Sequence, residues 1–142
     1  MLIPQAANAS LVVCSTCRFS PERRRDDAGR SAGELLAELL KAALPAHACR
    51  GKIDIQTMPC LFACSSHCTI FLRSQGRVGY ILGKFEPRQE HGAAILDYAE
   101  RYLDSADGVV PYARWPQGVK GHFLVRVPPE GFVFQPPIVA GN

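Results

Sequence analysis

The residues with the clearest chemical potential in this sequence are its cysteines. The chain has 142 residues and six cysteines, five of which fall into two groups. One group is a Cys-x2-Cys pair and the other is a Cys-x3-Cys-x3-Cys run: Cys14 and Cys17, then Cys60, Cys64 and Cys68. In a reducing compartment, such clusters bind metal or take part in redox chemistry more often than they form structural disulfides. The cysteines therefore predict a metal or redox site.

The spacing bears on which metal is bound. Four thiolates in a cytosolic protein commonly hold either Zn²⁺ or a [2Fe-2S] cluster. Structural zinc usually takes two short Cys-x2-Cys pairs, whereas one half of this pattern is Cys-x3-Cys. We expect a [2Fe-2S] cluster on Cys14, Cys17, Cys60 and Cys64, with zinc as the alternative. Cys68 is a fifth candidate metal ligand, a substitute for one of the four or a buried thiol.

Residues around the second group could support such a site. An apolar shell around the site would come from Leu61, Phe62, Ala63 and Ile70. Hydrogen bonds to sulfur would come from Ser65, Ser66 and Thr69. His67 could replace a thiolate, although a solvent-facing position in the loop is favoured. Cys49 stands alone near the end of a predicted helix, where we expect a buried thiol and not a ligand.

A thioredoxin-like thiol oxidoreductase is the enzymatic alternative, because the Cys14–Cys17 pair follows a predicted strand. A reactive thiol of that kind needs a helix N-terminus beside it to lower its pKa. The next predicted helix begins only at Ser31, fourteen residues after Cys17, which counts against this alternative. Nucleotide-binding loops and serine-hydrolase motifs are also missing from the sequence. We therefore expect no catalysis by the chain alone.

The predicted elements bring the two groups of cysteines together. Residues 9–13 form an apolar strand, and residues 52–58 alternate between apolar and polar types, as in a strand with one buried face. Between them, Ser31 and Glu34 form a capping box that predicts a helix ending near residue 44. If the two strands are parallel neighbours, both following loops leave the same edge of the sheet. The two cysteine groups would then converge.

The rest of the chain completes a single α/β domain. A β-hairpin is predicted over residues 69–82 and a second helix from residue 86 to before residue 107, which gives the order β-α-β-β-β-α. We expect an N-terminal arm at residues 1–8, the domain at residues 9–108 and a Pro/Gly-rich C-terminal extension at residues 109–142. The extension contains one further predicted strand, residues 123–127.

Charge and hydropathy limit the partners. The net charge of +3 is too small to predict nucleic-acid or membrane binding. The sequence lacks a membrane-spanning apolar run and a signal peptide at its start, so we expect a cytoplasmic protein. Arg23, Arg24 and Arg25 could dock an acidic redox partner, although the adjacent Asp26 and Asp27 favour a self-paired, solvated loop.

Four segments of the sequence resemble a bacterial family of uncharacterised predicted metal-binding proteins: residues 12–18, 60–68, 79–83 and 107–111. The resemblance extends over residues 11–129. That family is similar in turn to the thioredoxin-like [2Fe-2S] ferredoxins, so the resemblance implies a thioredoxin-like fold. By motif, Cys14 and Cys17 match the first ligand pair of those ferredoxins, which is more widely spaced there. Cys60 and Cys64 match the second pair, and Cys68 has no counterpart.

These observations together give a functional expectation. We expect a small metal-binding protein, a [2Fe-2S] ferredoxin-like electron carrier or redox sensor. The alternative is a zinc or cobalt protein in which a four-cysteine site holds the two loops together or transfers metal to another protein. Its partner would be a redox protein or a metal-trafficking protein, and the sequence leaves a homodimer open.

Overall fold

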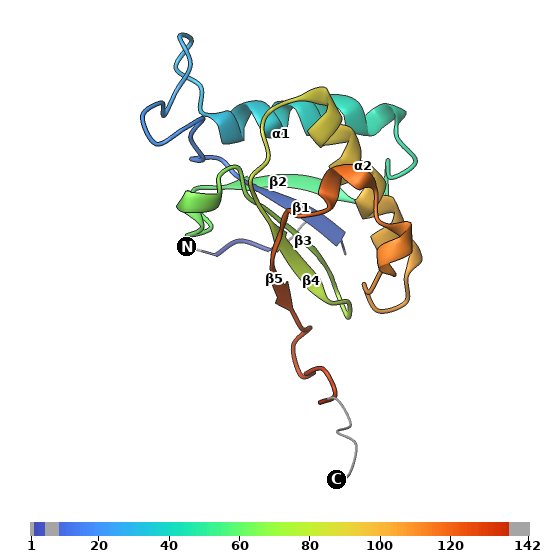
Figure 1. The fold of residues 1–142 in the computed structure, drawn as a ribbon. Helices are drawn as coiled ribbons and strands as arrows, with labels where there is room; N and C mark the ends of the chain where they lie inside the picture. The colour runs from blue at the N-terminus through green and yellow to red at the C-terminus, as the bar shows by residue number, and fades with distance from the viewer. Residues whose placement is uncertain (1, 5–8, 137–142) are drawn as a thin grey trace.

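The computed structural model describes residues 2–4 and 9–136, which form a five-stranded sheet covered on one face by two helices (Figure 1). The strand order is β2-β1-β3-β4-β5. The elements are β1 (Ala9–Cys14), α1 (Ala32–Ala43), β2 (Asp54–Met58), β3 (Ile70–Ser74), β4 (Gly79–Leu82), α2 (Gln89–Asp104) and β5 (Phe123–Val127). This mixed α/β arrangement confirms the predicted β-α-β-β-β-α order. The predicted strand at residues 123–127 is also confirmed.

The first three elements form the predicted parallel β-α-β unit. β1 pairs in parallel with β2, in a register that sets Leu11 beside Ile55 and Cys14 beside Met58. β1 pairs on its other side with β3, which is antiparallel to it. The predicted capping box is confirmed in its first half, because the Ser31 hydroxyl accepts a hydrogen bond of 3.1 Å from the backbone N–H of Glu34. The chain therefore enters α1 at the end of the sheet where β1 and β2 finish.

The hydrophobic core lies between the helices and the sheet. Its largest fully buried side chains come from both layers: Leu11, Leu36, Leu40, Ile70, Leu72, Leu82, Leu96, Tyr98 and Tyr102. Leu36 and Leu40 lie four residues apart, on the face of α1 that packs on the sheet. Removal of this apolar surface from water is the main force that holds α1 and α2 on the sheet.

The chain after α2 adds a fifth strand to the sheet. β5 pairs with β4 in antiparallel orientation, with an irregularity in register beside Leu82. The ring of Phe123 stacks on Trp115 at a centroid distance of 4.4 Å, and the indole N–H of Trp115 donates to the carbonyl of Val110 at 2.8 Å. Part of the predicted C-terminal extension is therefore packed on the same sheet as residues 9–108.

The two ends of the chain are described only in part. In the predicted N-terminal arm, residues 2–4 are described, and Leu2 and Ile3 are exposed. The rest of the arm, residues 1 and 5–8, lies outside the described residues, as do residues 137–142 of the predicted extension. Among the described residues, no helix has the length and apolar character needed to cross a membrane.

Candidate metal centre

The two cysteine loops leave the sheet side by side because β1 and β2 are parallel neighbours. The carbonyl of Met58, at the end of β2, accepts hydrogen bonds from the backbone N–H groups of Ser15 at 2.8 Å and Cys60 at 3.2 Å. The backbone N–H of Cys14 donates to Thr69 at 3.1 Å, just before β3. The start of each loop is thus tied to the same sheet edge, as the sequence predicted.

The N-terminus of α1 packs directly on the first loop. The Ser31 hydroxyl donates to the carbonyl of Ser15, and the backbone N–H of Gly33 donates to the carbonyl of Cys17 at 3.1 Å. The approach is so close that a side chain at Gly33 would collide with the carbonyl oxygen of Cys14. A glycine is required here because it lets the helix backbone lie against the strand end.

Three of the thiols are buried in this corner. Cys14, Cys17 and Cys68 have exposed fractions of 2%, 5% and 1%, respectively. The sulfur of Cys17 lies 3.5 Å from the hydroxyl of Thr69 and accepts a hydrogen bond of 3.4 Å from the backbone N–H of that residue. Cys68 is anchored by a pair of backbone hydrogen bonds to Phe85, at 2.9 and 3.3 Å.

The other two thiols form a more exposed pair. The sulfurs of Cys60 and Cys64 are 3.7 Å apart, and Cys64 is exposed at the surface. The backbone N–H of Phe62 turns back to donate to the sulfur of Cys60 at 3.2 Å. Both Cys60 and Phe62 have positive φ, at 128° and 59°, conformations that cost energy for residues other than glycine. The loop thus holds two sulfurs together at the cost of backbone strain.

The pKa values of Cys14, Cys17 and Cys64 are all raised above the ordinary value of a thiol. The pKa of Cys14 rises from 9.0 to about 12, first through its hydrogen bond with the Cys17 thiol and then through burial. The hydrogen bond with Cys14 lowers the pKa of Cys17, but the Cys68 thiol and burial outweigh it, so that this pKa is also raised. A hydrogen bond with Cys60 raises the pKa of Cys64. Metal-free, these three thiols are protonated at neutral pH.

The two groups approach each other across the loops. The backbone amide of Leu61, in the second loop, hydrogen-bonds to Cys14 closely enough to lower the pKa of its thiol. Cys17 and Cys64 both line one cavity of about 280 Å³. The sulfurs nevertheless do not gather around one point, because within the described part of the chain no three of them lie within 4.8 Å of one another.

The neighbours predicted from sequence have mixed outcomes. Thr69 contacts a cysteine sulfur as predicted. The prediction that Phe62 belongs to an apolar shell is wrong, because its side chain is 95% exposed and only its backbone reaches the site. His67 directs Nδ1 to the carbonyl of Cys64 at 2.8 Å. Cys49 is buried as predicted, with its thiol donating to the carbonyl of Leu96 on α2, away from the cysteine loops.

The predicted separation of the Cys14–Cys17 pair from the first helix is wrong. Thirteen residues lie between Cys17 and Ser31, yet the chain loops back and α1 starts against that pair. The first N–H groups of α1 bond to carbonyl and hydroxyl oxygens of Cys17 and Ser31 and not to a sulfur. The pKa of each thiol of the pair is raised, so the helix does not make either one a strong nucleophile.

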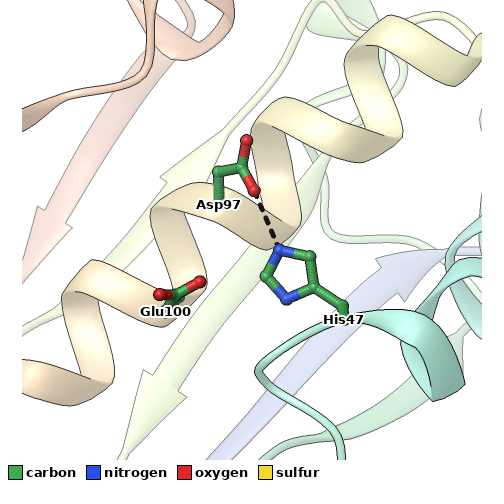
Figure 2. Close-up of side chains that lie close together, drawn as sticks. All are labelled: His47, Asp97 and Glu100. Atoms are coloured by element: carbon green, nitrogen blue, oxygen red, sulfur yellow. Dashed lines mark hydrogen bonds and ion pairs between the residues drawn. The ribbon is translucent and has the colours of Figure 1, made fainter.

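A second group of metal-binding residue types was not predicted from sequence. Ligand atoms of His47, Asp97 and Glu100 lie within 4.8 Å of one another (Figure 2). The Nδ1 atom of His47 accepts a hydrogen bond of 3.1 Å from the backbone N–H of Cys49, so that Nε2 carries the proton and donates to Asp97 at 2.8 Å. A metal at Nε2 would displace that proton. This group therefore ties the end of α1 to α2.

The strand order and the two helices have the fold of a thioredoxin-like [2Fe-2S] ferredoxin. The structure of a thioredoxin-like [2Fe-2S] ferredoxin from Aquifex aeolicus matches with a TM-score of 0.52 and 15% identity, over 90% of this chain and 100% of that chain. A crystal structure at 1.5 Å resolution of the wild-type thioredoxin-like [2Fe-2S] ferredoxin from Aquifex aeolicus has a TM-score of 0.48 and 16% identity, over 78% and 96% of the two chains.

At the level of sequence, residues 11–129 match the model of a family described as Protein of unknown function (DUF1636), and the chain belongs to this family. The family and its likeness to the thioredoxin-like ferredoxins agree with the resemblance noted from the sequence. Comparison with curated protein sequences gives no match.

Proposed function

We propose that this protein is a metal-binding redox protein that holds a [2Fe-2S] cluster and serves as an electron carrier or redox sensor in the cytoplasm. Cys14 and Cys17 would hold one iron, and Cys60 and Cys64 the other. Cys68, buried next to Cys17, is the reserve ligand. The cluster would supply one-electron chemistry when bound, and the chain would provide the thiolates, their hydrogen bonds and a route to the surface.

The separation between Cys60–Cys64 and the other sulfurs carries this proposal. In a tetrahedral zinc site, Zn–S bonds near 2.3 Å bring all four sulfurs to about 3.8 Å from one another. Here the Cys60–Cys64 distance of 3.7 Å fits two ligands on one metal ion, but no third described sulfur joins them within 4.8 Å. A cluster with two irons needs two such pairs at a larger separation. The geometry therefore supports a dinuclear centre over a single zinc ion.

The hydrogen bonds to sulfur also fit a cluster. Backbone N–H groups donate to a cysteine sulfur in each loop, from Thr69 to Cys17 and from Phe62 to Cys60. N–H···S hydrogen bonds stabilise the added negative charge of a reduced cluster and so tune its potential. Since Cys64 is exposed while Cys14 is buried, a partner protein could approach one side of the centre only.

The raised thiol pKa values favour metal binding over dithiol catalysis. A thiol oxidoreductase needs a thiolate at neutral pH, whereas the pKa of Cys14 is about 12. A bound cation stabilises thiolates and overcomes this effect, since metal ligands bind in the deprotonated form.

Anaerobic purification followed by an absorption spectrum with iron, zinc and acid-labile sulfide analysis tests the proposal. We expect visible charge-transfer bands and equal amounts of iron and sulfide, at about two of each per chain for a [2Fe-2S] centre. Cys17→Ser and Cys64→Ser should each lower the iron content by more than about tenfold. Cys49→Ser is the matched control, since Cys49 is a buried thiol outside the site. Colourless protein with stoichiometric zinc would overturn the proposal.

A further inference from the structure

An arginine-lined cavity lies between the two cysteine loops. It has a volume of about 280 Å³, and Arg18, Arg24 and Arg25 line it together with Cys17 and Cys64. We propose that the arginines of this cavity, Arg18, Arg24 and Arg25, bind a small oxyanion, a phosphate or a carboxylate. The inference goes beyond the proposed function, because the arginines carry it, whereas Cys17 and Cys64 would hold the cluster.

The cavity carries positive charge that the chain does not neutralise. No aspartate or glutamate of the described residues lines it. Arg25 is partly paired, with Glu34 at 3.6 Å. Arg18 and Arg24 form no ion pair within the described ranges, although one N–H of Arg18 donates to the carbonyl of Pro21 at 3.3 Å. The predicted self-pairing of the arginine segment is therefore incomplete at the cavity.

The long loop that bears these arginines has a defined shape. A carboxylate oxygen of Asp26 accepts from the backbone N–H groups of Ala28 at 3.0 Å and Arg30 at 2.8 Å. Gly29 has φ of +82°, which closes the turn, and a β-bridge then joins Arg25 to Ser31. The arginines at the start of this turn are consequently held over the cavity next to the beginning of α1.

The chemistry of the lining indicates the ligand class. A guanidinium group makes two parallel hydrogen bonds to a carboxylate or phosphate, which an ordinary neutral ligand cannot match. Ser31, the N-cap of the twelve-residue helix α1, also lines the cavity, so the positive end of the helix dipole adds to the field of the arginines. The cavity lies at the small end of ligand pockets, which run from about 300 Å³ upward. A small oxyanion suits this size.

Calorimetric titration of the purified, metal-loaded protein with inorganic phosphate, and separately with malonate, tests the inference. We expect saturable binding of at least one of the two probes, with a dissociation constant of about 1 mM or tighter. Arg24→Gln should weaken that binding by more than about tenfold, the loss of one charge-assisted hydrogen-bonded pair. Arg24 has no ion pair in the described structure and is exposed, so the fold should tolerate the change. Arg114→Gln, another exposed arginine away from the cavity, should change it less than about twofold.

The outcomes separate this inference from the proposed function. If neither anion binds saturably, or if Arg24→Gln and Arg114→Gln weaken binding equally, the inference fails whatever the metal content is. If Arg24→Gln loses the anion and keeps its iron and sulfide, both proposals stand. If the purified protein holds no cluster, the proposed function fails, and the same titration of that protein still decides whether the cavity binds an anion.

Discussion

The two cysteine loops start at one edge of the sheet, yet they hold their thiols in opposite ways. In the first loop, Cys14 and Cys17 are buried under the N-terminus of α1. In the second loop, Cys60 and Cys64 lie toward solvent, in a short segment with two residues at positive φ. The first pair is positioned by packing and the second by its own backbone. In the proposed metal centre, the first pair would be the buried anchor and the second pair the exposed side.

The largest expected effect is a difference in thiol reactivity between the loops. In metal-free protein at pH 8, we expect iodoacetamide to modify Cys64 at least about 100-fold faster than Cys14, because only about one Cys14 thiol in 10⁴ is ionised when its pKa is about 12. Mass spectrometry of peptides after timed quenching gives both rates. Cys49, buried and with a pKa raised to about 11 chiefly by burial, is the slow reference. Equal rates for Cys64 and Cys14 would remove the distinction between the loops.

The next effect tests whether packing of the helix holds the first loop. Gly33→Ala should lower the free energy of unfolding by about 2–3 kcal/mol, because the added methyl group collides with backbone at Cys14. The matched control is Gly29→Ala, whose methyl group would meet no other atom. This change should lower the free energy of unfolding by about 1 kcal/mol, because φ of +82° is unfavourable for alanine. Urea unfolding measures both. The helix contact would not be the positioning element if Gly33→Ala proved no more destabilising than Gly29→Ala.

The stability of the metal-free protein should depend on pH through the buried thiol of Cys14. The folded state keeps the Cys14 proton up to pH about 12, whereas the unfolded chain releases it near pH 9.0. The folded state thus binds more protons in this range. The contribution of Cys14 to the stability of metal-free protein is therefore complete below pH 9 and is lost as the pH rises toward 12. We expect a loss of about 1 kcal/mol between pH 8 and pH 10 from this residue. Denaturant unfolding at several pH values measures this loss. The free energy of unfolding of Cys14→Ser should fall less steeply with pH than that of the unchanged protein, and an equally steep fall would contradict the prediction.

The smallest effect lies at the other end of α1. Asp97→Asn should lower the stability by about 0.5 kcal/mol, because a neutral amide replaces the carboxylate that accepts a hydrogen bond from Nε2 of His47. Iron and sulfide content should be unchanged, since this contact is remote from the cysteine loops. A loss of metal in Asp97→Asn, measured with the assay used for the cysteine variants, would show that the His47 group takes part in metal binding.

The sequence predicted the elements better than it predicted their contacts. The capping box at Ser31 and the strand periodicities are local patterns, and they located α1 and the parallel strands because backbone hydrogen bonding and burial depend on near neighbours. The return of α1 to the first cysteine loop was missed, because the thirteen residues between Cys17 and Ser31 do not fix their distance in space. Gly33 carried the only sequence signal, as a glycine in the first turn of a helix.

The sequence also did not predict the side-chain environments of Phe62 in the second loop and of His47. Phe62 is an apolar residue among cysteines, which suggested a shell, but its positive φ turns the side chain into solvent. The partner of His47 lies fifty residues away on α2, and only the packing of the two helices brings it close. Patterns of residue type within a segment cannot encode such contacts between segments.

Electron paramagnetic resonance of the anaerobically purified, chemically reduced protein shows whether the cysteines hold a [2Fe-2S] cluster. We expect the signal of a reduced [2Fe-2S] centre at about one unpaired electron per chain. We also expect that Cys17→Ser and Cys64→Ser, one from each loop, lose or alter the signal, while Cys49→Ser keeps it. A protein without this signal before and after reduction, with one zinc ion bound by its thiolates, would contradict the account.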